Sequence, residues 1–483
     1  MMEGTLSWVR TVLDSRGRLV ASNLAGHDDE PWFGASIDSR TECTHRIFFA
    51  LRGETTDGHR FIDEARAGGC SAVVVEDEAA ATALSLAGTP FFRVRRGLEA
   101  LQELSRAYRD TLGIRVIAVT GSMGKTTTKE YIRAILKKKY RVHSNAGNLN
   151  NHIGVPLTIL ETDHDNEYLV CEIAANHVGE IEFLSGLIRP DIGVITNVGD
   201  AHIGYFGGRD KIAEAKSEIF TGIDPEGYAV LPADDAFIDT LRGKAACRVV
   251  TFGRAESSTY VVSDVKEGVE RIGFAINGGP MEIKGIGAYN ALNAAAAYAV
   301  GELCGVEFDR IRSALVEEEP LAGRAKVYRG RGVVLIDDSY NANPTSMRAA
   351  VDSLGRVDAS RRIAVLGDMA ELGTFSDAAH RELGGYIARG AIDVLCWYGE
   401  SGDRVEEGFS PRKASSEKVS SRKGSSRRPG KEFRSYRRID ELVRDLQKEI
   451  RAGDAVLIKA SRACHLDKVV DGLLETILKK DKD

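Results

Sequence analysis

The sequence of 483 residues lacks the features that mark several classes of protein. Its seven cysteines lie far apart and form no C-x-x-C pair, which argues against a disulfide framework or a thiolate zinc site and favours reduced thiols. No apolar run reaches the roughly 18–20 residues of a membrane helix, and residues 1–18 lack the apolar core of a signal peptide. We therefore expect a soluble cytoplasmic protein and not an integral membrane protein.

An excess of positive charge is also missing. The net charge is −6, so no basic field over the whole chain indicates a nucleic-acid partner, and we expect none. We find no internal repeat. A composition of 43% hydrophobic and 28% charged residues is typical of a globular protein, and about 150 residues per domain predicts roughly three domains.

Short β-branched segments alternate with segments of helical periodicity, a pattern typical of parallel sheets covered by helices. The pattern restarts near residue 114 and again near residue 323. We therefore predict an α/β protein of three domains, at 1–112, 113–322 and 323–483. The first is a small α/β domain, the second has the parallel sheet and helices of a P-loop ATPase, and the third is Rossmann-like. The alanine-rich segment 290–305 is expected to be a buried helix.

One segment of the third unit, 410–438, has a different composition. It carries 11 Lys and Arg against two Glu and shows no apolar periodicity. Such a composition cannot bury a core, so we predict a disordered basic insertion. It is either a solvated loop without a function or a tether to an anionic membrane or RNA.

The segment VTGSMGKTTTKEY, 119–131, lies between a predicted strand and a predicted helix. Its glycines would let backbone N–H groups approach phosphate oxygens at the helix N-terminus. Lys125 would neutralise the phosphates and the Thr126 hydroxyl would bind Mg²⁺. The common spacing G-x-x-x-x-G-K-[ST] would place a glycine at Val119, so a purely structural strand–turn–helix stays an alternative. The predicted nucleotide-binding loop comprises Gly121, Ser122, Met123, Gly124, Lys125, Thr126 and Thr127.

Two polar residues follow further predicted strands. Glu172 lies at the end of YLVCEI and His202 follows VITNVGDA, and the carboxyl ends of neighbouring parallel strands converge on a ligand crevice. A carboxylate and an imidazole there could hold a divalent metal, although each is commonly a hydrogen-bonded residue at the end of a strand. Lys216, on a predicted helix, would by itself be an ordinary solvated lysine. The residue pattern alone predicts an enzyme that uses Mg²⁺ and ATP.

Six segments occur in an order that resembles the Mur ligase family. They are VTGSMGKTTTKEY, NAGNLNNHIGVPLT, VITNVGDAHIGYFGGRDKIAEAKSEIF, IDDSYNANPTSM, VLGDMAELG and VLIKASR. The segment IDSRTECTHRIFFALRGETTDGHRFIDEARAGG resembles the UDP-sugar-binding domain of the same family, and together the segments extend from about residue 35 to 470. The family loop reads T-G-x-x-G-K-T-[TS], so the absence of a glycine at 119 is what the resemblance implies.

The resemblance implies a role for each matching position. Catalysis falls to Lys125, Glu172, His202 and Lys216. Metal binding falls to Thr126, Glu172, His202 and Lys216, the last as a carbamylated lysine. Nucleotide contacts fall to Asn290, Arg324 and Asp338, the last two brought in by domain closure. Substrate contacts fall to Asp38, Ser39, Arg40, Asn341 and Asn343. For the two asparagines, a turn before Pro344 is an equal alternative.

The implied reaction is ATP-dependent amide formation through an acyl phosphate. D-Ala-D-Ala would be joined to UDP-MurNAc-tripeptide with ATP and two Mg²⁺ ions, giving UDP-MurNAc-pentapeptide for peptidoglycan, and we expect a monomer. The chain lacks the Asp-Asn-Pro-Arg motif of the diaminopimelate-adding relatives and has DDSYNANPTSM instead. A diaminopimelate- or lysine-adding ligase and a non-catalytic, nucleotide-dependent scaffold are the alternatives. The segment GIGAYNAL departs from the family because it lacks a histidine and is one residue shorter.

Overall fold

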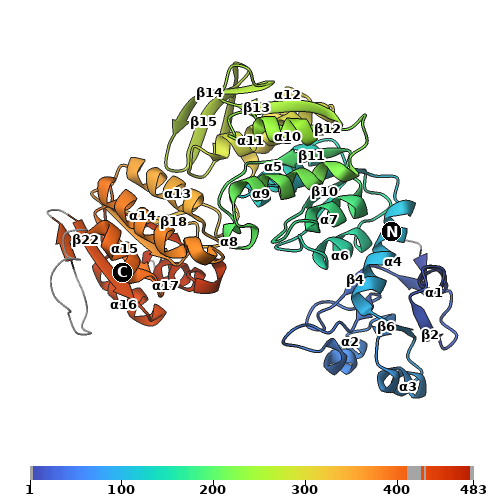
Figure 1. Ribbon diagram of the computed structural model, residues 1–483. Coiled ribbons are helices and arrows are strands. Elements are labelled where there is room, and N and C mark those ends of the chain that lie inside the picture. The colour runs from blue at the N-terminus through green and yellow to red at the C-terminus, as the bar shows by residue number, and fades with distance from the viewer. Residues whose placement is uncertain (1–3, 411–425, 429–430, 479–483) are drawn as a thin grey trace.

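The computed structural model describes residues 4–410, 426–428 and 431–478. Three α/β units follow one another along the chain, built on sheets of five, nine and seven strands. Figure 1 shows the N-terminal unit in blue, the central unit in green and yellow, and the C-terminal unit in orange and red. The prediction of a three-part α/β fold is confirmed. Within the described chain, no helix is both long enough and apolar enough to cross a membrane.

The N-terminal unit has a sheet in the order β2–β7–β6–β5–β4, in which only β2 is antiparallel to its neighbour. Its strands are β2 (Leu19–Asn23), β4 (Ala35–Ser36), β5 (Ile47–Phe49), β6 (Ala72–Val75) and β7 (Phe91–Val94), and β1 (Gly4–Thr5) pairs with β3 (Pro31–Trp32). Its helices are α1 (Leu6–Ser15), η1 (Gly58–Phe61), α2 (Ile62–Ala67), α3 (Glu78–Leu86) and α4 (Gly97–Thr111). All residues of β6 are buried, which explains its unbroken β-branched sequence.

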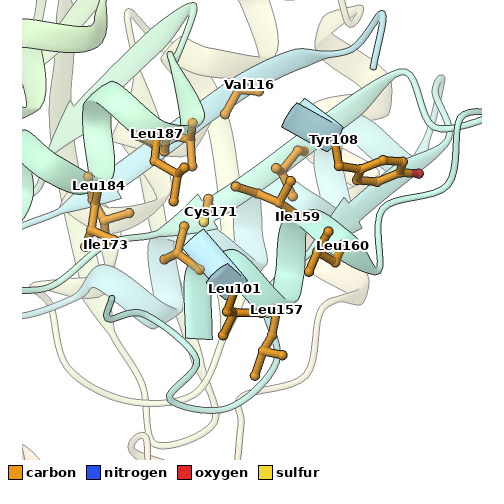
Figure 2. Packing of buried hydrophobic residues seen from close by; sticks show 14 of the residues in the cluster. Leu101, Tyr108, Val116, Leu157, Ile159, Leu160, Cys171, Ile173, Leu184 and Leu187 are labelled. Atoms are coloured by element: carbon orange, nitrogen blue, oxygen red, sulfur yellow. The ribbon is translucent and has the colours of Figure 1, made fainter. Parts of the chain in front are cut away.

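Helix α4 fixes the N-terminal unit to the central one. Leu101 and Tyr108 of α4 pack beside Ile159, Leu160 and Cys171 of the central unit in one buried cluster (Figure 2). The Tyr108 hydroxyl donates a hydrogen bond of 2.7 Å to the carbonyl oxygen of Thr162. The two units therefore share a hydrophobic core.

The central unit has a sheet in the order β16–β15–β14–β13–β12–β11–β8–β10–β9. Its strands β8 to β14 are parallel and are followed by an antiparallel extension of β15 and β16. The strands are β8 (Arg115–Thr120), β9 (Val142–Ser144), β10 (Tyr168–Glu172), β11 (Ile192–Ile195), β12 (Tyr228–Pro232), β13 (Arg248–Gly253), β14 (Tyr260–Glu267), β15 (Arg271–Ile276) and β16 (Gly279–Lys284). The helices are α5 (Lys125–Lys137), α6 (Gly154–Leu160), α7 (Glu180–Ile188), α8 (Ile203–Phe206), α9 (Arg209–Ser217), η2 (Glu218–Gly222), α10 (Ile238–Lys244), α11 (Asn290–Leu303) and α12 (Phe308–Glu317). As predicted, the alanine-rich α11 is buried.

The C-terminal unit has a sheet in the order β17–β18–β23–β19–β20–β22–β21, with antiparallel pairs only at its two edges. Its strands are β17 (Lys326–Gly330), β18 (Val333–Asp337), β19 (Arg361–Gly367), β20 (Val394–Tyr398), β21 (Ser426–Arg428), β22 (Lys431–Tyr436) and β23 (Asp454–Lys459). Its helices are α13 (Pro344–Arg356), η3 (Gly373–Phe375), α14 (Ser376–Arg389), α15 (Gly402–Phe409), α16 (Ile439–Glu449), η4 (Arg462–Cys464) and α17 (Asp467–Ile477).

The prediction of a disordered insertion over 410–438 is wrong at its C-terminal end. Strand β22 pairs in parallel with β20, and its Phe433 and Tyr436 are buried. The high charge of the segment made a strand look unfavourable in the sequence. In the structure, ion pairs with Glu432 and Glu449 neutralise Arg434. Residues 411–425 and 429–430 lie outside the described residues, and the prediction for them lies outside as well.

Candidate functional site

A cavity of about 380 Å³ lies between the central and C-terminal units. Most of the predicted site residues line it: Ser122, Met123, Gly124, Lys125, Thr126, Thr127, Glu172, His202, Asn290, Arg324, Asp338, Asn341 and Asn343. Gly121 and Lys216 do not line it, and neither do Asp38, Ser39 and Arg40. Segments far apart in the sequence thus meet where the carboxyl ends of parallel strands open, as expected for an α/β fold.

The loop between β8 and α5 requires glycine at two positions. Gly121 and Gly124 have φ of +145° and +78°, values that favour glycine. A Cβ on Gly121 would lie 1.9 Å from Oγ1 of Thr196, and one on Gly124 would lie 2.3 Å from Oδ1 of Asn293. Val119 is a fully buried residue of β8, so it is a strand residue and not a lost loop glycine.

Lys125 is the first residue of α5 and turns back toward the loop. Its Nζ donates a hydrogen bond of 2.9 Å to the carbonyl oxygen of Gly121. Burial lowers the pKa of Lys125, and the charge of Glu172 opposes that shift. A partly buried cation beside the N-terminus of a 13-residue helix is suited to an anionic ligand.

Glu172, the last residue of β10, is held by hydrogen bonds to both carboxylate oxygens. Oε2 accepts from the Thr126 hydroxyl at 2.8 Å, and Oε1 accepts from Nδ2 of Asn150 at 2.8 Å. Nη2 of Arg324 in turn donates to Oγ1 of Thr126 at 3.0 Å. Asn150 was not predicted as a site residue, although the segment NAGNLNNHIGVPLT that contains it resembles the family.

The oxygens of Thr126 and Glu172 fit a magnesium ion, because Mg²⁺ prefers oxygen ligands and keeps several waters. They lie 2.8 Å apart at the end of the phosphate loop. Among the described residues, no three His, Cys, Asp or Glu side chains gather into a metal-binding group. The fit therefore rests on a hydroxyl and one carboxylate.

His202 comes directly before α8 and has a left-handed backbone with φ of +60°. Its Nδ1 lies 2.6 Å from Oε2 of Glu371 in the C-terminal unit. The close approach of His202 is the main reason why the pKa of Glu371 is lowered. Sequence reasoning missed Glu371, although it lies in the segment VLGDMAELG, directly after β19.

Lys216 lies on α9 and is only 1% exposed. The alternative of an ordinary solvated lysine is therefore wrong. Burial lowers the pKa of Lys216 to about 7, and the positive charge of Lys125 adds to this effect. A lysine with this pKa exists in substantial part as the uncharged, nucleophilic amine at neutral pH.

Asn290 lines the cavity from the central unit and Asp338 from the C-terminal unit. Nδ2 of Asn290 donates to the carbonyl oxygen of Ile286 at 2.9 Å, and its Oδ1 accepts from Nδ2 of Asn293 at 2.9 Å. Oδ2 of Asp338 accepts from Nζ of Lys459 at 2.6 Å. Burial raises the pKa of Asp338, although Lys459 opposes the shift. Lys459 was not predicted, although it lies in the family-like segment VLIKASR.

The ring of Tyr289 occupies space beside the shortened GIGAYNAL segment. A Cβ on Gly287, which has φ of +100°, would lie 2.4 Å from Cε1 of Tyr289. Tyr289 also lines the cavity beside Asn290. The ring of Tyr289 thus fills the space that a side chain at position 287 would occupy.

Asn341 and Asn343 precede α13. Oδ1 of Asn343 accepts from the backbone N–H of Ser346 at 2.9 Å and caps that helix. The carbonyl oxygen of Asn341 accepts from Nζ of Lys459 at 2.9 Å. Asn343 therefore has the structural role that the alternative of a turn before Pro344 predicts, because its side chain caps the helix.

Asp38, Ser39 and Arg40 lie in the N-terminal unit between β4 and β5. Hydrogen bonds from Arg40 lower the pKa of Asp38 to about 2, and Nη2 of Arg40 lies 2.7 Å from Oδ2 of Asp38. The Ser39 hydroxyl donates to Oε2 of Glu64 at 2.8 Å. These three residues form a separate polar loop.

Comparison with known proteins covers most of the chain. Residues 34–109, 119–301 and 323–462 match models described as Mur ligase family, catalytic domain; Mur ligase middle domain; and Mur ligase, glutamate ligase domain. The chain is 35% identical over 453 residues to UDP-N-acetylmuramoyl-tripeptide–D-alanyl-D-alanine ligase of Bacillus subtilis, covering 92% of this chain and 94% of that protein.

Two solved structures are similar over their whole length. MurF from Acinetobacter baumannii has a TM-score of 0.79 and 30% identity, covering 92% of this chain and 99% of that one. MurF ligase from Thermotoga maritima in complex with ADP has a TM-score of 0.75 and 29% identity, covering 92% and 98%.

Proposed function

The chain belongs to the Mur ligase family, and from this premise we propose that it joins D-alanyl-D-alanine to UDP-N-acetylmuramoyl-tripeptide with hydrolysis of ATP to ADP. The product would be the UDP-MurNAc-pentapeptide of peptidoglycan synthesis. Relatives bearing the name of that ligase match 92–96% of this chain at 34–35% identity. One solved neighbour holds ADP.

One observation carries the proposal. The Thr126 hydroxyl of the phosphate loop is hydrogen-bonded both to Glu172 of the same unit and to Arg324, which lies where the third unit begins. This arrangement places a cation, a hydroxyl and a carboxylate around one point at a helix N-terminus. Such a group of side chains suits a polyphosphate whose terminal phosphoryl group is transferred.

The roles of the side chains follow from their positions. Lys125 and Arg324 would bind the β- and γ-phosphates of ATP, while Asn290 and Asp338 would contact the nucleoside. Thr126 and Glu172 would hold Mg²⁺, with His202 and a carbamylated Lys216 at a second ion. Bound Mg²⁺ screens the phosphate charge and polarises the γ-phosphoryl group. The lowered pKa of Lys216 supports carbamylation, because only the uncharged amine reacts with CO₂.

The reaction would proceed in two steps. A carboxylate oxygen of the tripeptide attacks the γ-phosphorus, and the bond between this phosphorus and the β–γ bridging oxygen breaks. ADP departs, and the tripeptide now carries an acyl phosphate. The uncharged amine of D-Ala-D-Ala then attacks the acyl carbon, phosphate departs, and the amine loses a proton. Lys125 and Arg324 would stabilise the charge that develops on the transferred phosphoryl group. Closure of the cavity around the reactants would limit hydrolysis of the acyl phosphate.

We further propose domain boundaries at 1–112, 113–322 and 323–483, with Asp38, Ser39 and Arg40 contacting the UDP-sugar in the first domain. Asn341 and Asn343 would lie beside the D-Ala-D-Ala, with Asn343 acting through the cap of α13. We also propose a cytoplasmic monomer; its seven cysteines, all within the described residues, are free thiols, as is usual in a reducing compartment.

The proposal is tested by phosphate release from the purified protein with ATP, Mg²⁺ and UDP-MurNAc-tripeptide. Addition of D-Ala-D-Ala should start turnover and give a pentapeptide product by mass spectrometry. Parallel reactions with lysine- and diaminopimelate-containing tripeptides would define the third residue. Turnover only with UDP-MurNAc-dipeptide and a free diamino acid would contradict the proposal.

A further inference from the structure

The guanidinium of Arg324 lies flat against an aromatic ring. Its Cζ is 3.9 Å from the centroid of Tyr340, and Cζ of Arg462 is 5.9 Å from the same centroid. A guanidinium at this distance from a tyrosine ring is attracted by the ring's negative face. One ring thus holds two arginine side chains at the edge of the cavity that Tyr340 and Arg324 both line.

The backbone of Arg324 is tied to the same segment. The Gly323 N–H donates to Oδ2 of Asp337 at 2.7 Å, and the Tyr340 N–H donates to the carbonyl oxygen of Gly323 at 3.2 Å. Gly323 has φ of +75°, and a Cβ there would lie 3.0 Å from Cβ of Tyr340. Arg324 is therefore attached to the end of β18 through both its backbone and its side chain, and it moves with the C-terminal sheet.

The other end of the guanidinium reaches the central unit. Nη2 of Arg324 donates to Oγ1 of Thr126 at 3.0 Å. An arginine side chain has many rotamers, so ordering it costs conformational entropy. Contact with the Tyr340 ring favours the rotamer whose Nη2 reaches Thr126.

We propose that Tyr340 is a positioning residue that holds Arg324 against the phosphate loop, so that approach of the C-terminal domain delivers an ordered guanidinium to the terminal phosphates of the nucleotide. The ring, and not the hydroxyl, performs this role, because the contact is made by the face of the ring. This inference rests on the proposed function for its nucleotide, but not on the identity of the amine that is joined.

The test compares Tyr340→Phe, which keeps the ring, with Tyr340→Leu, which keeps only apolar volume. The leucine variant should lose roughly 2- to 30-fold in kcat/KM for ATP, the range that a cation–π contact supports. The phenylalanine variant should stay within about twofold of the parent. Tyr386→Leu is the matched control, because Tyr386 faces Arg348 at 5.8 Å in the same unit and does not line the cavity.

Two further measurements separate positioning from a general packing role. In the Arg324→Met background, Tyr340→Leu should have little further effect on kcat/KM, since Tyr340 acts through Arg324. Calorimetry with ADP should show Tyr340→Phe binding as the parent does, with thermal unfolding unchanged. Equal losses in the phenylalanine and leucine variants, an unchanged leucine variant, or additive effects with Arg324→Met would each overturn the inference.

The two proposals fail in different ways. If the parent protein shows no turnover with D-Ala-D-Ala, the proposed function fails, yet ADP binding still tests Tyr340. If the parent turns over and Tyr340→Leu matches it, only the inference about Tyr340 fails.

Discussion

His202 of the central unit and Glu371 of the C-terminal unit meet with Nδ1 2.6 Å from Oε2. The backbone beside them is paired as well, since the Gly204 N–H donates to the carbonyl oxygen of Glu371 at 2.9 Å. The Thr345 hydroxyl donates to Oδ2 of Asp200 at 2.8 Å nearby. The two units are therefore joined at the cavity by side-chain and main-chain contacts, and their separation would dismantle the site.

Glu371→Gln should lower kcat/KM for ATP by about 3- to 10-fold, because it removes the negative charge that lies 2.6 Å from Nδ1 of His202. Steady-state kinetics at several ATP concentrations would measure the loss. Glu382→Gln is the control, since Glu382 pairs with Arg348 on the exposed surface of the same unit. Equal kinetics in the two variants would contradict a role for the His202–Glu371 pair.

Gly204→Ala should impair the association of the two units. A Cβ at this position would lie 2.5 Å from the backbone N of Gly373 and 2.6 Å from the carbonyl oxygen of Glu371. We expect a larger radius of gyration in small-angle scattering and at least about tenfold lower turnover, because backbone cannot yield as a side chain does. Gly208→Ala is the control, as nothing lies within 4 Å of a Cβ there. A compact and active Gly204→Ala protein would refute this expectation.

Thr126→Val should reduce turnover by at least about tenfold, because it removes the hydroxyl that donates to Glu172 and accepts from Arg324. Thr128→Val is the matched control, because it makes the same substitution on the same helix and is expected to leave turnover unchanged. The Thr128 hydroxyl is buried and has no hydrogen-bond partner among the residues that the structure describes, so its loss should leave activity unchanged and preserve or raise Tm. Activity losses of the same size in both variants would show that helix packing, and not the Thr126 hydroxyl, is responsible.

Lys216 should make stability depend on pH. Its pKa is about 7 in the folded protein and about 10.4 in an unfolded chain, so between these values the folded state binds fewer protons. Stability should therefore fall as pH falls from about 10 toward 7 and then remain at its low value. Lys216→Met removes this cost, so its Tm advantage over the parent should be largest near pH 7 and shrink by pH 9.5.

The comparison with Lys216→Met is made by calorimetry in buffer freed of CO₂, so that the amine is unmodified. A Tm difference that stays constant between the two pH values would mean that Lys216 does not titrate in this range.

The sequence predicts β8, β10 and β11 of the central sheet because their apolar runs are almost wholly buried. It does not predict α14 and α15, because glycines interrupt their helical patterns. A Cβ on Gly384 would lie 2.1 Å from the carbonyl oxygen of Val405, and one on Gly408 would lie 1.9 Å from that of Arg381. The same glycines that lower helix propensity let the two helices pack closely, and only the folded structure shows this contact.

The residues of the site also fall into those that the sequence predicts and those that it does not. Lys125, Thr126 and Glu172 follow from strand ends and loop chemistry, which are local properties of the sequence. Glu371 and Lys459 depend on how the third unit meets the second and on which strand lies beside β18. Neither relationship is encoded by local periodicity, so the sequence alone does not connect these residues with the phosphate loop.

The order of strands in the C-terminal sheet also bears on how the protein is made. Strand β23 lies between β18 and β19, although it is among the last segments of the chain to be synthesised. During synthesis, β18 ends at Asp337 and β19 at Gly367, long before β23 begins at Asp454. The position between these two strands therefore stays empty until β23 has been made. Lys459, which holds Asp338, arrives on that same strand. A nascent chain thus acquires a complete nucleotide site only when translation is nearly finished.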